Sequence, residues 1–186
     1  MKNIILVVIL LINASLYAQR DTLRFGKDDG QPNSKTIGPE GGKISSMDGG
    51  VELIFPAGAL AKAMLITIQP TVNLAHNASG KSYRFEPSGI QFKKPVQLIF
   101  HYTDEENAAC PADAMGFASQ DDNGKWKYFD YDDVDTIAKT ITGSIHHFSG
   151  YSKMKKIMLR PGKKLIGVDT KTYIEVLDTS GIEEDG

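Results

Sequence analysis

The chain has 186 residues, of which 41% are hydrophobic and 24% are charged, and its formal net charge is −2. This composition is typical of globular proteins and lacks the signature of disorder. The charge balance argues against nucleic-acid binding, which depends on concentrated Lys and Arg. The length predicts one domain of about 100–150 residues with additional segments.

Residues 1–18 have the features of a secretory signal peptide. Lys2 gives a positive start, residues 4–12 are all apolar, and small and polar residues lead to a cleavage point after Ala18. The apolar run is too short to span a bilayer, which needs about 20 residues. An uncleaved N-terminal anchor is the alternative. We therefore expect an exported protein, periplasmic, surface-bound or secreted, with no integral membrane segment after signal removal.

The single cysteine, Cys110, cannot form an internal disulfide. An exported domain of this size without disulfides has to be held together by its core, which suits a bacterial envelope or secreted protein. Cys110 also lies in a predicted loop without the helical or basic surroundings that activate a thiol, so we expect it to be inert.

Residues 19–35 are polar and rich in turn-forming residues, and they are predicted to be a linker. From residue 36 onward, short runs of β-branched and aromatic residues alternate with Gly- and Pro-containing turns. In the run 96–102, Val96, Leu98, Phe100 and Tyr102 occupy alternate positions, which is the period of a half-buried strand. The predicted strands are 43–45, 51–55, 64–68, 83–85, 96–102, 115–119, 126–130, 136–145, 156–160 and 172–177.

No segment has the 3.6-residue period of a helix, although residues 56–64 could form a single turn. Asn123-Gly124 predicts a tight hairpin between two strands, and Gly89 is expected to have positive φ in a turn. Trp126 is interpreted as covering the edge of the core, with a ligand platform as the alternative. Many short strands with regular turns predict an all-β fold, an antiparallel β-sandwich.

The stretch 36–102 resembles the ZU-5 domain of ankyrins, zonula occludens proteins and netrin receptors. The resemblance is carried in order by "IGPEGGKISSMDGGVELIFPAGAL", "MLITIQP" and "YRFEPSGIQFKKPVQLIFHY". Similar modules in bacterial exported proteins often close with His-Phe-Ser, here His147-Phe148-Ser149. The resemblance implies a β-sandwich over 36–153 and a function in protein binding. Ankyrin's copy docks on spectrin, but no spectrin-binding surface transfers to these positions.

Residues 154–186 differ in character, with two or three strand candidates followed by an acidic tail. Two strands do not bury a core by themselves. They either complete the sandwich or begin a second domain, and we favour the second because "LRPGKKLIGVDTKTYIEV" resembles the opening strands of an immunoglobulin-like module.

The ZU-5 resemblance also implies one candidate reaction, since some relatives cut themselves between Phe and Ser of a His-Phe-Ser segment. Ser149 would attack the Phe148 carbonyl, converting the amide to an ester, and His147 would take the proton or polarise the bond. The structural interpretation is preferred. Alternation along a strand would place Ile145, His147 and Ser149 on one face and His146 with Phe148 on the other, which makes Phe148 a core residue.

Metal and cofactor sites are not predicted. Adjacent His146 and His147 would point in opposite directions on a strand, and nothing in the spacing brings His101 or His76 to either of them. The acidic run 130–135 offers oxygen ligands for calcium, but position six of such a loop is Asp135 and position twelve is Ile141, where Gly and Glu are needed. A solvated loop is the preferred interpretation.

The sequence thus predicts a non-enzymatic, exported module of the cell envelope that acts in protein interaction or as a structural unit, with a protein partner. The alternative is a module that cleaves itself between Phe148 and Ser149. A calcium- or carbohydrate-binding surface domain is the second alternative.

Overall fold

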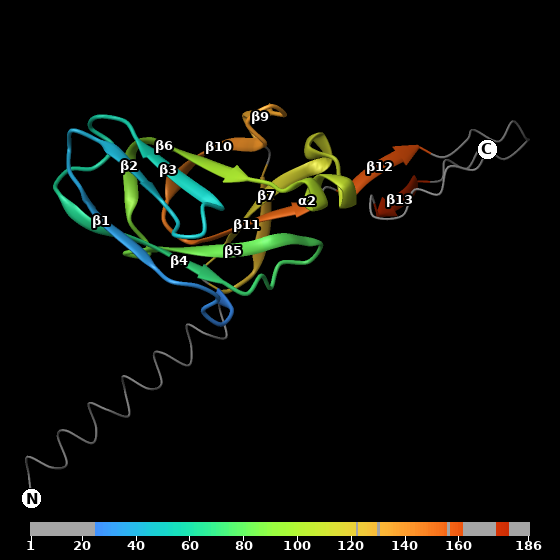
Figure 1. Ribbon diagram of the computed structural model, residues 1–186, viewed down its shortest axis with the longest axis horizontal. Helices are drawn as coiled ribbons and strands as arrows, with labels where there is room; N and C mark the ends of the chain where they lie inside the picture. Colours follow the sequence, from blue (N-terminus) through green and yellow to red (C-terminus); the bar gives the residue numbers. More distant parts are fainter. Residues whose placement is uncertain (1–24, 122, 130, 156, 162–173, 179–186) are drawn as a thin grey trace, which may run out of the picture.

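A computed structural model describes residues 25–121, 123–129, 131–155, 157–161 and 174–178. Two antiparallel sheets pack face to face in it, which confirms the predicted all-β sandwich (Figure 1). The six-stranded sheet has the order β1 (Asn33–Ile37), β4 (Met64–Thr71), β5 (Ala78–Glu86), β11 (Gly150–Lys155), β7 (Met115–Gln120), β8 (Trp126–Phe129). The five-stranded sheet has the order β2 (Gly42–Ser45), β3 (Val51–Phe55), β6 (Gln91–His101), β10 (Thr140–His147), β9 (Asp133–Asp135).

Period-two patterning is the reason these segments form two-faced strands. In β6, Val96, Leu98 and Phe100 are buried, whereas Gln97 and His101 between and after them are exposed, as the sequence predicts. β3 alternates in the same way and pairs with β6 so that the buried residues of both strands face the second sheet.

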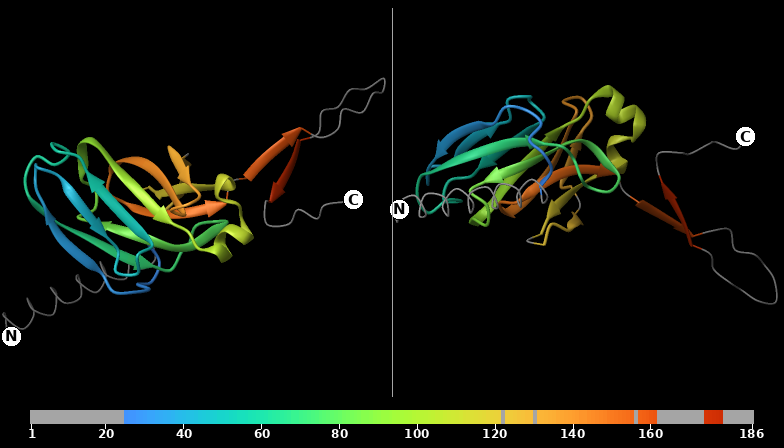
Figure 2. Two further views of the ribbon diagram at one scale, coloured as in Figure 1. Left: turned by 45° about the horizontal axis from the view of Figure 1, so that its top comes forward. Right: turned by 90° about the horizontal axis from the view of Figure 1, so that it is seen from below.

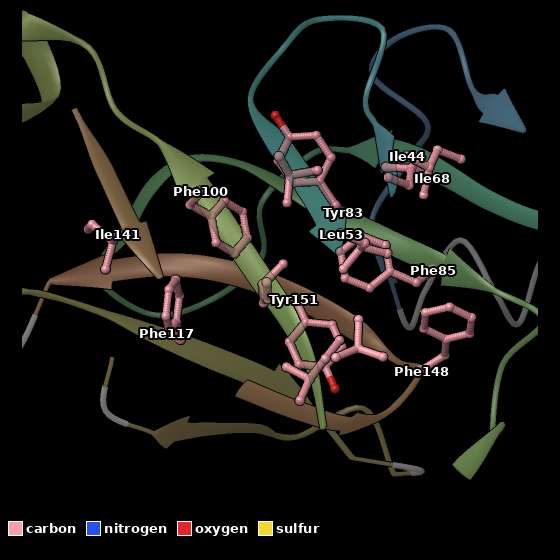
Figure 3. Close-up of a cluster of buried hydrophobic side chains, with 14 of the residues drawn as sticks. Ile44, Leu53, Ile68, Tyr83, Phe85, Phe100, Phe117, Ile141, Phe148 and Tyr151 are labelled. Carbon is pink, nitrogen blue, oxygen red and sulfur yellow. The ribbon is translucent and has the colours of Figure 1, made fainter. Parts of the chain in front are cut away.

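Aromatic rings run through the core between the two sheets (Figure 3). Phe85 stacks on Tyr151 with 5.3 Å between ring centroids, and Phe100 lies 5.4 Å from Phe117. Burial of such rings is the main source of stability in a fold without disulfides.

The predicted linker 19–35 is wrong in the part that the structure describes. β1 begins inside it, the Asp29 N–H donates to the Pro70 carbonyl at 2.9 Å, and Phe25 is buried. Phe25 fills the space beside Gly150, where an added Cβ would contact its ring. The polar composition of the segment gave no sign that Phe25 packs into the sandwich or that the backbone bonds to the sheet.

The predicted strand 136–145 is also wrong at its start. The Asp135 carboxylate accepts hydrogen bonds from the N–H groups of Ile137 and Ala138, both at 2.8 Å, and Lys139 has a φ of 54°. These residues therefore form a turn that joins β9 to β10, because the side-chain acceptor replaces the sheet partners.

Two short helical elements were not predicted: α2 (Asp104–Ala109) and the 3₁₀ turn η1 (Ala112–Ala114). The Thr103 hydroxyl accepts from the Glu106 N–H at 3.1 Å, and the Glu106 carboxylate accepts from the Thr103 N–H at 2.9 Å, a complete capping box. Cys110 is the C-cap residue of α2 and is buried, where the sequence predicted a loop. No described helix has the length and apolar character needed to cross a membrane.

The predicted hairpin between β7 and β8 is confirmed. Gly124 has a φ of 80°, and the Asp121 carboxylate accepts from the Lys125 N–H at 2.9 Å to close the turn. Gly89 has the expected positive φ of 78°. Trp126 is half-buried and lies outside both the core cluster and the residues packed against it.

The segment after the sandwich forms a sheet of its own. β12 (Ile157–Pro161) pairs with β13 (Ile174–Asp178) and with neither sandwich sheet, so these strands do not complete the sandwich (Figure 2). β11 continues to Lys155, two residues past the predicted boundary at 153. The immunoglobulin-like assignment stays a prediction, and the predicted signal peptide 1–18 lies outside the described residues.

Candidate functional site

The His-Phe-Ser segment connects the two sheets. β10 ends at His147 in the five-stranded sheet, and β11 begins at Gly150 in the six-stranded sheet, so Phe148 and Ser149 carry the chain across. A register shift between Ile145 and His147 precedes the crossing. The expected alternation is therefore wrong, because Ile145, Phe148 and Ser149 are all buried.

Backbone hydrogen bonds hold the Phe148–Ser149 peptide from several sides. The Phe148 N–H donates to the Ile90 carbonyl at 3.0 Å, and the Phe148 carbonyl accepts from the Gly89 N–H at 3.3 Å. The Ser149 carbonyl accepts from the Phe85 N–H at 3.1 Å. The turn that contains Gly89 thus bonds to the first half of the crossing and β5 to the second.

Phe148 is a core residue, as the structural interpretation of the sequence predicts. Its side chain is 2% exposed, and its ring meets three others edge-on: Phe92 at 4.9 Å, Phe85 at 5.9 Å and Phe55 at 6.1 Å between centroids. Figure 3 shows it beside Phe85 at one end of the cluster. It fills the space between the sheets at the point where the chain crosses.

The polar groups of the segment are not arranged as a nucleophile and its base. The Ser149 hydroxyl is buried and donates to the Gln120 carbonyl oxygen, which cannot accept a proton as a base. His147 Nδ1 lies 3.3 Å from the Phe148 carbonyl oxygen, and the His147 carbonyl accepts from the Tyr151 hydroxyl at 2.7 Å. The imidazole can polarise the Phe148 carbonyl, but its Nδ1 contacts that carbonyl and not the serine that would have to be activated.

The structure does not bring together the candidate metal ligands that were weighed from the sequence. His146 is exposed and His147 is half-buried, and in the described part of the chain no three His, Cys, Asp or Glu residues gather as metal ligands. Within the acidic run, Asp132 accepts from the Ser144 hydroxyl at 2.7 Å, and Asp135 caps the turn that follows it. These two carboxylates serve the local loop structure.

A second feature, missed by sequence reasoning, is a buried ion pair at the end of the sandwich near α2. Lys153 on β11 is only 4% exposed, yet its ammonium lies 2.7 Å from the Glu106 carboxylate and also donates to the His101 carbonyl. Burial lowers the pKa of Lys153, and the contact with Glu106 opposes that shift. Because Glu106 also belongs to the capping box, the pair fixes α2 to the sheet.

Beside this pair, a second polar cluster surrounds Tyr83. Its hydroxyl lies 3.3 Å from both carboxylate oxygens of Asp48, and burial together with that charge raises the pKa of Tyr83. Burial also works against ionisation of Asp48, but hydrogen bonds from Ser46 and the Gly50 N–H, with the Lys81 charge, keep its pKa below the ordinary value. An added Cβ at Gly50 would overlap the Tyr83 hydroxyl, so glycine makes this approach possible.

These groups line an open hollow of about 350 Å³ between the β2–β3 turn, β5, β11 and α2. The sequence did carry one usable signal for it: "TDEE" at 103–106 is a capping-box pattern that could have placed α2. Nothing local indicates that Lys153 is buried, because its partner lies 47 residues away in the chain.

A smaller hollow of about 250 Å³ lies beside the crossing, on the side of β8 and β10. His146, His147, Tyr128, Phe129 and Tyr151 contribute to its walls. The buried Ser149 is not among the residues that line it.

No family model matches the chain, and no curated protein matches it either. The ZU-5 resemblance therefore depends on the sequence motifs quoted above.

Proposed function

We propose that the chain is a non-enzymatic, exported β-sandwich of ZU-5 type that associates with another protein or serves as a structural unit of the cell envelope. One observation carries the association: the sandwich has a filled aromatic core, yet it leaves large apolar side chains exposed on its connecting loops, as at Met47, Leu74 and Ile137. Exposed apolar groups that gather on loops are characteristic of interaction surfaces.

The hydrogen-bonded crossing supports a structural role for the motif that otherwise suggests chemistry. Phe148 packs on three rings, and the Ser149 hydroxyl is bonded to Gln120. Export is supported by the signal-like residues 1–18.

Cross-linking tests the association. The tagged chain beginning after Ala18 is cross-linked in the envelope fraction of its source cells, with the tag alone as control. We expect one stoichiometric adduct whose protein component, once identified and purified, binds the chain again. If no adduct can be reconstituted from purified components, the association hypothesis is refuted and a role as a structural spacer is favoured.

Self-processing is the second candidate, because His147 Nδ1 contacts the carbonyl oxygen of the bond that would be cut. Ser149 Oγ would attack the Phe148 carbonyl carbon, and the bond from that carbon to the Ser149 nitrogen would break as the hydroxyl proton passes to the nitrogen. Water would then hydrolyse the resulting ester. Intact mass of the purified protein distinguishes the candidates. We expect one uncut species for the native chain and for Ser149→Ala, with Ser144→Ala as a matched control. Two fragments that disappear only in Ser149→Ala would establish cleavage.

A further inference from the structure

Exposed apolar residues gather at one end of the sandwich. Turn 46–50 and turn 136–139 flank the end of β6, since the His101 N–H donates to the Gly50 carbonyl and the Tyr102 N–H to the Lys139 carbonyl, both at 3.0 Å. Loop 72–77 reaches the same end, where Asn73 bonds to the Gly80 carbonyl at 3.0 Å. We call turn 46–50, loop 72–77, α2 and turn 136–139 the α2 end.

This end carries four of the six large apolar side chains that are exposed in the described residues. Ile137 is 95% exposed and Met47 is 64% exposed at the tips of their turns, and Val72 and Leu74 lie on the third loop. Single exposed apolar residues are ordinary on protein surfaces, but the concentration of four of them on three loops at one end of the sandwich is not.

The loops are held in place without a partner. Asp135 fixes the turn that presents Ile137, and the Lys139 ammonium lies 2.7 Å from the Asp104 carboxylate of α2. On the other side, Lys81 lies 3.5 Å from the carboxylate of Asp48, the residue after Met47. A surface ordered in advance loses little conformational entropy when it binds, so more of its contact energy appears as affinity.

On α2 and the two turns 46–50 and 136–139, acidic residues outnumber basic ones: Asp48, Asp104, Glu105 and Glu106 against Lys139. Lys81, Lys139 and Lys153 each have a carboxylate partner. Glu105 on α2 is exposed and has no Lys or Arg at ion-pair distance among the described residues. The field at the rim of this surface therefore favours an approaching cation.

We propose that the α2 end is the docking surface for a protein segment that presents an apolar side chain flanked by Lys or Arg. This inference rests on the proposed association function and names its surface and the partner's chemistry. The apolar side chain packs among Met47, Ile137 and the hollow beside Tyr83, and the basic residues face Glu105 and the other carboxylates of α2. A phospholipid surface with anionic headgroups fits less well, because the exposed carboxylates would be repelled by it.

Peptide display tests the proposal. A library of random dodecapeptides is selected for binding to the immobilised chain that begins after Ala18. We expect enrichment of peptides with an apolar residue flanked by Lys or Arg, and weaker binding at higher salt. Affinity for the best synthetic peptide should fall at least tenfold in the double variant Met47→Ser/Ile137→Ser and at least threefold in Glu105→Lys. Leu65→Ser, an exposed apolar residue on β4, is the matched control and should bind like the native chain. Thermal melting confirms that each variant is folded.

Three results would overturn the proposal: no enriched peptide, enrichment of acidic or uncharged peptides, or affinity that survives the double variant. Sedimentation of the chain with phosphatidylcholine–phosphatidylglycerol vesicles, abolished by the double variant, would also overturn it in favour of a membrane. A partner that still cross-links to the double variant would refute this surface but leave the association function intact.

Discussion

Replacing Phe148 with alanine tests the central packing contact of the crossing. The ring is 2% exposed and contacts Phe92, Phe85 and Phe55. A buried Phe→Ala change costs about 3–5 kcal/mol, which includes the cavity that the lost ring leaves. Domains have about 5–15 kcal/mol of stability in total, so this single change should remove about a fifth of it or more.

Urea unfolding followed by far-UV circular dichroism measures the effect. With a slope of about 2 kcal/mol per M, a loss of about 4 kcal/mol moves the midpoint down by about 2 M. Phe148→Leu is the matched control, because leucine fills most of the space but loses ring pairs worth about 0.5–1.5 kcal/mol each. A midpoint shift below about 0.5 M for Phe148→Ala, or equal shifts for both variants, would refute the assignment of Phe148 as a core residue.

Two further predictions follow from the packing and the electrostatics. Gly143→Ala should cost about 1–3 kcal/mol in urea unfolding, because its Cβ would overlap the buried ring of Phe117. Gly116→Ala, whose Cβ meets the half-exposed Tyr128 ring, should cost under about 1 kcal/mol, and equal costs would contradict the packing described here. Burial raises the pKa of Tyr151 above 10.0, so the unfolded chain loses that proton first and stability falls as pH rises past about 10. Tyr151→Phe should flatten this fall between pH 10 and about 12, and parallel stability curves would disprove the linkage.

Strand existence was predictable from sequence where the pattern has period two and the run is long. β3 and β6 show the alternation plainly, and the interior of the sandwich follows from it. Turn chemistry was also readable at Gly124 and Gly89, since each needs a positive φ that glycine adopts without strain.

Other features depend on contacts that no local pattern reveals. α2 has six residues, too few for a helical period to be visible, and its formation depends on the capping box and the tie to Lys153. In the sequence Lys153 is indistinguishable from an exposed strand lysine, because its burial depends on the ion pair with Glu106 of α2. Phe25 was hidden in a polar segment because a single apolar anchor has no periodicity.

The geometry of the crossing explains why a His-Phe-Ser match by itself is a weak indicator of self-cleavage. The chain leaves one sheet after His147 and enters the other at Gly150, so only two residues span the gap. A large apolar side chain at the first position fills the core between the sheets, and a small hydroxyl residue at the second satisfies the Gln120 carbonyl in a buried place. A sandwich with this crossing favours these residue types for packing and hydrogen bonding alone. Cleavage has additional requirements. The Ser149 hydroxyl must break its hydrogen bond to the Gln120 carbonyl, approach the carbonyl carbon of Phe148 and transfer its proton to a base.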